Sequence, residues 1–378
     1  MLIEKVVIRK MKMDLKFPFQ TSFGTEQERL FLITEIHSGN HVGYGECVVN
    51  ANPYYSEETV STAFSIIKEF LLPLILGKVL QHPDEANEMF KHIRRNNMAK
   101  STIENALWDL YAKTQNKPLA EVIGGQKSEI AVGVSIGIQE TKEDLVIKVK
   151  ELLDKGYQKI KLKIKPEKDI DYLRNIREIF GDIPIMADAN SAYTLEDIEL
   201  FKEIDKLNLI MIEQPLSHDD IIDHAILQKD INTPICLDES IHSVEDARKA
   251  IKMGSCKIIN IKIGRVGGIS EAIKIHNLCV EHNIPVWCGG MLESGIGRAF
   301  NIAITSLPNF TIPGDTAPSS NYWERDIIIP EVTMDAKGYI QIPTSPGIGF
   351  EIDQEALDLF TLELFEFTKD SLTSNHAS

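Results

Sequence analysis

The sequence predicts an α/β protein in which a parallel (β/α) barrel follows a smaller α+β unit. Two observations lead to this fold class. The first is a period: five charged residues lie at intervals of 25, 25, 25 and 24, at or next to the ends of apolar, β-branched runs. One strand, one helix and two short loops occupy about 25 residues. In a parallel barrel such strand ends meet at the rim where barrel enzymes do their chemistry. The five residues are Lys163, Asp188, Glu213, Asp238 and Lys262.

The second observation is that the pattern upstream of residue 126 is different. The segments IEKVVIRKMKMDL, LFLITEI and HVGYGECVV, within residues 1 to about 50, alternate like strands. From about 57 to 122, apolar residues recur at the three-to-four spacing of helices in EETVSTAFSIIKEFL, HPDEANEMFKHIRR and STIENALWDLYAKT. We therefore expect residues 1–125 to form a separate α+β domain.

Strands and helices alternate from about residue 129 onward. EIAVGVSIGI reads as the first strand and EDLVIKVKELLDKG as an amphipathic helix, and the five runs with charged ends follow. IPVWCGGML gives a seventh strand and TIPGD a short eighth, which predicts a barrel over residues 126–326. We expect the segment from about 327 to 370 to return to the first domain, and 371–378 to be a disordered tail.

Composition narrows the class of partner. The formal charge of −16 over 378 residues argues against nucleic acid and anionic membranes, which bind basic surfaces. The longest apolar stretch, FLLPLILG, is too short to span a bilayer, and the N-terminus lacks the apolar core of a signal peptide. Five scattered cysteines without metal-ligand spacing indicate reduced thiols in a cytoplasmic protein. They are Cys47, Cys236, Cys256, Cys279 and Cys288.

The three central carboxylates predict a cation site. Asp188, Glu213 and Asp238 would project into the barrel mouth from adjacent strands, and carboxylates this close cannot all stay ionised without a cation. Oxygen ligands on a rigid frame suit Mg²⁺ or Mn²⁺ rather than zinc. Acidic residues after strands often cap the next helix instead. Here Thr194 and Ser243 already begin capping-box-like sequences, so Asp188 and Asp238 have no capping role.

Lysines flank these carboxylates on both sides. Alternate strand residues share a face, so Lys161, Lys163 and Lys165 point the same way, as do Asn260 and Lys262. Lys165, nearest the strand end, is expected to reach solvent.

A set of motifs resembles the enolase superfamily. The resemblance is closest to its muconate-lactonising subgroup, and within it to the o-succinylbenzoate synthase / N-acylamino acid racemase family. It covers essentially the whole chain and implies an enolase-like (β/α)7β-type barrel with an α+β N-terminal capping domain. The motifs are KLK (161–163), ADAN (187–190), IEQP (212–215), LDES (237–240), NIKIGRVGG (260–268) and GGMLESGIGRA (289–299).

The resemblance also implies roles for the rim residues. The metal would be Mg²⁺, which Mn²⁺ or another divalent cation could replace. Its ligands would be Asp188, Glu213 and Asp238, and the acid/base pair on opposite faces of the substrate would be Lys163 and Lys262. Residues that support the charge distribution would be Lys161, Asn190 and Arg265.

The substrate pocket is expected under two N-terminal loops, 18–25 and 48–55. By the resemblance they place Phe19, Phe23, Tyr54 and Tyr55 over the mouth, although ordinary domain-interface packing explains these side chains equally well. The barrel side would be lined by Ser135, Gly290, Met291 and Leu292. Three histidines without a partner motif are expected at the surface: His218, His242 and His282.

The expected activity is Mg²⁺-dependent α-proton abstraction from a small carboxylate through an enediolate. Two reactions remain open: o-succinylbenzoate synthesis, the dehydration of 2-succinyl-6-hydroxy-2,4-cyclohexadiene-1-carboxylate in menaquinone biosynthesis, and N-succinyl- or N-acylamino acid racemisation. The position where mandelate racemases carry histidine reads Cys288–Met291. The short eighth strand carries a single aspartate, Asp315, which disfavours substrates with a free amino group. The alternatives are a muconate-type cycloisomerase and a non-catalytic metal-binding barrel. A homo-oligomer is expected.

Overall fold

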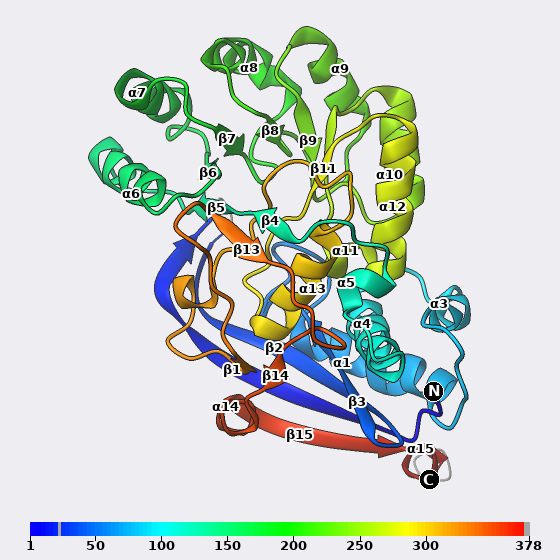
Figure 1. Ribbon diagram of the computed structural model, residues 1–378. Helices are drawn as coiled ribbons and strands as arrows, with labels where there is room; N and C mark the ends of the chain where they lie inside the picture. The colour runs from blue at the N-terminus through cyan, green and yellow to red at the C-terminus, as the bar shows by residue number, and fades with distance from the viewer. Residues whose placement is uncertain (22–23, 374–378) are drawn as a thin grey trace.

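The computed structural model describes residues 1–21 and 24–373 and contains two main sheets (Figure 1). The first is antiparallel, with the strand order β15-β1-β2-β3. The second is parallel, with the order β11-β10-β9-β8-β7-β6-β5, and it curls at the centre of the helices α6 to α12. The predicted combination of a parallel barrel and an α+β capping domain is therefore confirmed.

The capping sheet is covered on one side by helices. Its strands are β1 (Lys5–Gln20), β2 (Thr25–Ser38), β3 (His41–Cys47) and β15 (Thr361–Thr368). The long helix α4 packs against the backbone of β3, because a Cβ added to Gly43 or Gly45 would lie 2.1 Å from a carbonyl oxygen of α4. The helices are α1 (Val60–Ile66), the π-helical η1 (Ile67–Leu71), α2 (Leu72–Ile75), α3 (Asp84–Phe90), α4 (Asn97–Thr114) and α5 (Leu119–Val122).

The barrel strands are short, and their register sets the site. They are β5 (Gly133–Ile136), β6 (Lys159–Lys163), β7 (Ile185–Asp188), β8 (Ile212–Glu213), β9 (Ile235–Leu237), β10 (Ile258–Asn260) and β11 (Val286–Trp287). Lys163 pairs with Asp188, and Asp188 with Glu213, so three predicted site residues stand side by side.

Helices connect these strands and bury their apolar stripes against them. They are α6 (Lys142–Asp154), α7 (Ile170–Phe180), η2 (Leu195–Asp197), α8 (Ile198–Ile204), η3 (Asp205–Leu207), α9 (Ile222–Asp230), α10 (Val244–Met253), α11 (Ile263–Val266), α12 (Ile269–Glu281) and α13 (Gly295–Thr305). The predicted caps are present, since the side chains of Thr194 and Ser243 accept backbone hydrogen bonds at the starts of η2 and α10. The acids of the rim are thus not needed as caps.

The eighth strand is reduced to single bridges. Phe310 bridges to Val286, and Gly314 bridges to Val132, so residues 310–315 close the ring between β11 and β5 without a regular ladder. Pro313 explains the difference from the predicted strand, because proline has no N–H to donate.

The C-terminal residues add one strand to the capping sheet and take part in two small two-stranded sheets. After η4 (Ser319–Asn321), β12 (Ile328–Ile329) pairs with β14 (Glu351–Ile352), and β13 (Tyr339–Gln341) with β4 (Glu129–Ala131). Helix α14 (Gln354–Phe360) leads into β15, which pairs antiparallel with β1. Residues 371–373, expected in a disordered tail, end the helix α15 (Lys369–Thr373), and 374–378 lie outside the described residues. Among the described helices, none is long and apolar enough to cross a membrane.

Candidate active site

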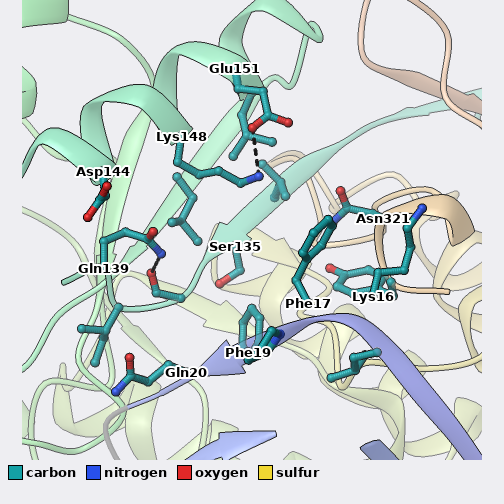
Figure 2. A pocket seen from close by; sticks show the side chains of 18 of the residues that line it. Lys16, Phe17, Phe19, Gln20, Ser135, Gln139, Asp144, Lys148, Glu151 and Asn321 are labelled. Atoms are coloured by element: carbon teal, nitrogen blue, oxygen red, sulfur yellow. Dashed lines mark hydrogen bonds and ion pairs between the residues drawn. The ribbon is translucent and has the colours of Figure 1, made fainter. Parts of the chain in front are cut away.

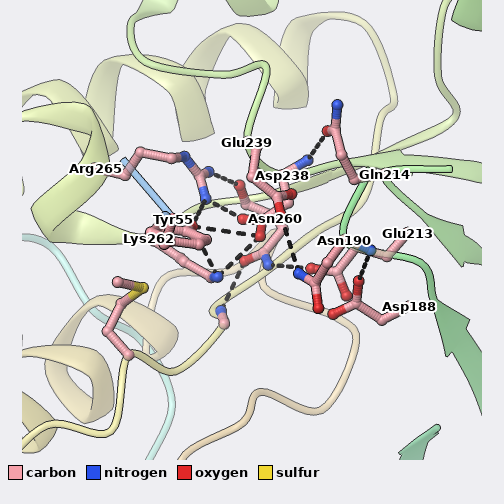
Figure 3. Close-up of polar contacts among 12 residues, drawn as sticks. Tyr55, Asp188, Asn190, Glu213, Gln214, Asp238, Glu239, Asn260, Lys262 and Arg265 are labelled. Atoms are coloured by element: carbon pink, nitrogen blue, oxygen red, sulfur yellow. Dashed lines mark hydrogen bonds and ion pairs between the residues drawn. The ribbon is translucent and has the colours of Figure 1, made fainter. Parts of the chain in front are cut away.

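The predicted rim residues come together at the carboxyl ends of the parallel strands (Figure 3). Asp188 and Glu213 end β7 and β8, Asp238 follows β9, and Lys262 follows β10. All three carboxylate residues are 0% exposed, and Lys262 is 5% exposed. The charged residues that recur every 24 or 25 positions in the sequence therefore form one buried cluster of opposite charges.

Two lysines of β6 hold the first two carboxylates. Lys161 Nζ lies 2.8 Å from Asp188 Oδ2 and 2.7 Å from Glu213 Oε2. Lys163 Nζ lies 2.6 Å from Asp188 Oδ2 and also donates to Asn190 Oδ1. Burial works against the charge of Lys161, but the carboxylates around it outweigh burial and raise its pKa well above the usual value.

Lys262 and Arg265 hold the third carboxylate. Lys262 Nζ donates to Asp238 Oδ2 at 2.8 Å and to Tyr55 Oη at 2.9 Å, and Arg265 Nη1 donates to Asp238 Oδ1. Burial opposes the charge of Asp238, yet Arg265 and Lys262 outweigh it and hold its pKa well below the usual value. Likewise, burial is outweighed by Asp238 and Tyr55 at Lys262, so the pKa of Lys262 is raised.

The donor set fits a divalent cation. Glu213 Oε2 makes no hydrogen bond of good geometry, although Lys161 Nζ is within ion-pair distance. Burial, and then the charge of Asp188, outweigh the nearby lysines and raise the pKa of Glu213 to about 7, so this carboxylate would gain from more positive charge beside it. Within the described chain, no group of three or more Asp, Glu, His or Cys side chains is already arranged around one point. Instead, each of the three carboxylates points toward a lysine ammonium group, which supplies the positive charge beside it.

Polar residues surround the three carboxylates and hydrogen-bond to them or to their neighbours. Asn260 Nδ2 donates to Glu213 Oε1 at 2.8 Å, while its Oδ1 accepts from the Gly289 backbone at 2.7 Å. Gln214 Oε1 accepts from the Asp238 backbone at 3.0 Å. Glu239 Oε1 accepts from Asn190 Nδ2 at 2.9 Å. Sequence reasoning assigned no role to Gln214 and Glu239, although both lie inside the motifs IEQP and LDES.

A second layer of charge lies beneath Lys161. Lys159 is wholly buried, its Nζ lies 3.5 Å from the centre of the Trp287 ring, and it pairs with Asp315 Oδ1 at 3.2 Å. Asp315 Oδ2 faces Lys161 Nζ at 3.4 Å. Sequence reasoning missed Lys159 and Trp287, although Lys159 precedes Lys161 by two residues and so shares its face of the strand. Both oxygens of Asp315 are thus engaged by lysines of β6.

The predicted substrate residues divide between two cavities. Phe19 and Ser135 line a cavity of about 870 Å³ between the end of β1, one side of α6 and η4 (Figure 2). Tyr54 and Tyr55 line a second cavity, of about 350 Å³, together with Asn190, Glu239 and Arg265. Tyr54 is 66% exposed, whereas Tyr55 reaches the rim.

Other predicted pocket residues are packed elsewhere. Met291 lies in the apolar core of the capping domain, and Leu292, in the left-handed region with φ of 57°, packs on the barrel core. Gly290 lies close to Asp315, whose carbonyl oxygen would be 2.8 Å from an added Cβ. Phe23 lies outside the described residues.

One of the three histidines differs from its prediction. His218 and His282 are exposed, but His242 is half-buried and lines the second cavity. Burial, and then Arg265, lower the pKa of His242 to about 4. Sequence pattern alone does not reveal this, because the burial of His242 depends on how the loop after β9 packs.

Two family models match almost the whole chain. Residues 3–124 match the mandelate racemase / muconate lactonizing enzyme N-terminal domain, and residues 144–356 match the enolase C-terminal domain-like model. A solved structure of an enolase superfamily member from Listeria innocua superposes with a TM-score of 0.95 at 44% identity, covering 98% of this chain and 100% of that one.

Close relatives carry two enzyme names. An o-succinylbenzoate synthase from Geobacillus kaustophilus is 55% identical over 95% of this chain and 96% of its own length. An N-succinylamino acid racemase from Thermus thermophilus is 43% identical over 96% of this chain and 98% of its own. The chain is an enzyme of the enolase superfamily and belongs to the o-succinylbenzoate synthase / N-acylamino acid racemase family within its muconate-lactonising subgroup.

Proposed function

We propose that this enzyme abstracts the α-proton of a carboxylate substrate with Lys163 and Lys262 as its acid/base residues. The observation that carries the proposal is that each lysine is held against a different carboxylate of one buried cluster, Lys163 at Asp188 and Lys262 at Asp238. Asp188, Glu213 and Asp238 would hold Mg²⁺, or another divalent cation in its place. When bound, that cation would stabilise the negative charge that develops on the substrate carboxylate.

The lysines exchange the protons. An enediolate forms when one lysine removes the α-proton, and the protonated lysine can then donate it to a leaving group. For racemisation the opposite lysine must donate a proton to the other face of the same carbon. Lys161, between Asp188 and Glu213, supplies fixed positive charge. Tyr54 and Tyr55 at the second cavity, and Phe19 at the first, would help to exclude water.

Both reactions named among the relatives are candidates: dehydration to o-succinylbenzoate, in menaquinone biosynthesis, and racemisation of an N-succinyl- or N-acylamino acid. The surroundings of Asp315 favour a substrate whose nitrogen is acylated. Lys159 and Lys161 already engage both oxygens of Asp315, so this carboxylate is not available for a substrate ammonium group. A chloromuconate cycloisomerase is only 26% identical, so lactonisation is less supported. We further propose that the enzyme is a homo-oligomer. We also propose that it is cytoplasmic, which its five free, buried cysteines support.

Removal of one ligand tests the metal. Asp238→Asn takes away a charged oxygen ligand, so we expect turnover to fall by orders of magnitude. The wild type should lose activity in excess EDTA and regain it with Mg²⁺. Full activity of the wild type in EDTA would contradict the metal assignment.

Replacement of each lysine tests the acid/base pair. Lys163→Ala should abolish both dehydration and racemisation. Lys262→Arg should abolish racemisation, because guanidinium stays protonated, but can leave dehydration with Lys163 as the single base. NMR in D₂O with an N-succinylamino acid should show that Lys262→Arg exchanges the α-proton of one enantiomer without inverting it. Efficient racemisation by either variant would refute the model, and a non-catalytic barrel would show no Mg²⁺-dependent exchange in the wild type.

A further inference from the structure

We infer that the capping domain positions one of the two lysines, Lys262, and that Tyr55 and Asn97 are the residues through which it does so. The inference rests on the proposed function, and it goes further by assigning control of one face of the substrate to the capping domain. Neither residue is proposed to exchange a proton. Both are positioning residues. Tyr55 acts on the side chain of Lys262, and Asn97 acts on the helix α11, which begins directly after Lys262.

Tyr55 contacts the ammonium group itself. Its Oη accepts from Lys262 Nζ at 2.9 Å and from Arg265 Nη1 at 3.3 Å, and the Lys262 ammonium lies 4.6 Å from the centre of the Tyr55 ring (Figure 3). The loop that carries Tyr55 is tied down three residues later. Buried Glu58 accepts from the backbone N–H groups of Met98 at 2.8 Å and Ala99 at 2.9 Å, in the first turn of α4. Tyr55 therefore presents a fixed hydroxyl.

Asn97 contacts the backbone behind Lys262. As the first residue of α4, it donates from Nδ2 to the carbonyl oxygen of Arg265 at 2.8 Å and to that of His242 at 3.1 Å. Arg265 lies in α11, which begins directly after Lys262. The capping domain also packs closely on α11 at Val48, because a Cβ added to Gly264 would lie 2.3 Å from a methyl carbon of Val48. One capping helix thus holds the turn on which Lys262 stands.

Lys163 is held differently. In the described part of the chain its hydrogen bonds and ion pairs go to Asp188 and Asn190, which both belong to the barrel. A displacement of the Tyr55 loop or of α4 should therefore move Lys262 and leave Lys163 in place. Racemisation needs both lysines as proton carriers, whereas dehydration from one face needs only Lys163, so the two reactions should respond differently to changes in the capping domain.

The decisive variant is Tyr55→Phe, which keeps the ring and removes the hydroxyl. Tyr339→Phe, on β13 and outside the lining of both cavities, is the matched control. Each variant is loaded with Mg²⁺, and α-proton exchange of each enantiomer of an N-succinylamino acid is followed separately in D₂O, with kcat and KM measured for each. The enantiomer that Lys262→Arg still exchanges defines the Lys163 face.

We expect Tyr55→Phe to lower kcat for exchange on the Lys262 face by about tenfold to a hundredfold, as small misplacements of catalytic groups do. Exchange on the Lys163 face should change by less than about twofold, and Tyr339→Phe should match the wild type on both faces. Asn97→Ala should show the same one-sided loss without removing any atom of the pocket.

Two outcomes would overturn the inference. Equal loss on both faces, or a rise in KM for both enantiomers with kcat unchanged, would mean that Tyr55 only binds substrate or supports the fold. No loss on the Lys262 face in either variant would mean that the capping domain does not position that lysine. If the wild type itself exchanges no α-proton, the proposed function fails, which is a result distinct from both.

Discussion

At the scale of single residues, the buried carboxylate of Glu46 joins the two domains. Glu46 lies on β3 of the capping domain and accepts from Ser294 N at 3.1 Å, Ser294 Oγ at 2.6 Å and Gly297 N at 2.9 Å, at the start of α13. Burial outweighs these hydrogen bonds and raises the pKa of Glu46 from its usual value to about 7. The folded protein therefore holds this proton more tightly than the unfolded chain does.

This raised pKa predicts a pH-dependent stability. Because the folded pKa lies above the unfolded value of 4.5, the contribution of Glu46 is fully present below about pH 4.5 and is lost as the pH rises toward 7. The full shift corresponds to about 3 kcal/mol. Glu46→Gln, which cannot titrate, should not lose this contribution, so the stability of the wild type relative to the variant should fall as the pH rises from 4.5 to about 7 and then stay level. Urea unfolding across this range measures it, and a pH-independent difference would contradict the assignment.

Position in the fold could be predicted best for residues that are located by the strand in which they lie. Asp188 and Glu213 could be placed at the rim because the strand period fixes where each βα unit ends. The contact of Tyr55 with Lys262 could not be predicted, since it joins residues 207 positions apart through the docking of two domains. The full burial of Lys159 was equally hidden, because a lysine near a strand end is more often solvated.

At the scale of elements, a capping-domain carboxylate also holds the start of a barrel helix. Glu104 of α4 is wholly buried and accepts from the backbone N–H groups of Ile269 at 2.7 Å and Ser270 at 2.9 Å, the first two residues of α12. It also accepts from Trp108 Nε1 at 2.8 Å. The preceding Gly268 leaves room for this carboxylate, since an added Cβ would lie 2.2 Å from Glu104 Oε2.

Loss of this contact should destabilise the protein. Glu104→Ala leaves the buried backbone N–H groups of Ile269 and Ser270 without their acceptor, and each unsatisfied buried group costs about 1–3 kcal/mol. We expect a loss of about 3 kcal/mol or more in the free energy of unfolding. Glu121→Ala, which breaks only an exposed pair with Lys117, is the control and should cost less than about 1 kcal/mol. Equal denaturation midpoints for the two variants would show that Glu104 does not stabilise the helix start.

Element types were easier to predict than element ends. The helices of the barrel follow from apolar spacing, and α6 begins at a Thr141 cap whose side chain accepts from Asp144 N, as capping rules require. The sequence predicts TIPGD, residues 311–315, as a short eighth strand from its place after the seventh strand and the helix that follows it. Its pairing is limited to bridges, which periodicity alone cannot reveal.

At the scale of the whole molecule, the two ends of the chain complete one sheet. β15 pairs with β1 along residues 5–11, with Lys5 opposite Thr368, and places Phe367, 7% exposed, in the capping core. Phe365 packs on Phe64 of α1 with ring centres 4.6 Å apart. The capping domain therefore needs residues that lie beyond the barrel in sequence, and the loop that carries Tyr55 depends on them through this shared core.

Truncation tests this dependence. A chain that ends at Phe360 lacks β15, exposes the edge of β1 and leaves the places of Phe365 and Phe367 empty. Burial of two such side chains contributes about 3 kcal/mol or more. We expect a lower unfolding temperature, faster proteolysis within residues 1–125 and loss of turnover, because Tyr55 and α4 would no longer be held against Lys262. A chain that ends at Thr373 keeps β15 and α15 and should match the full-length enzyme in all three measurements. If the shorter chain kept the wild-type unfolding temperature and resistance to proteolysis, the capping domain would be stable without its last strand, and its hold on Lys262 would depend on β1, β2, β3 and their helices alone.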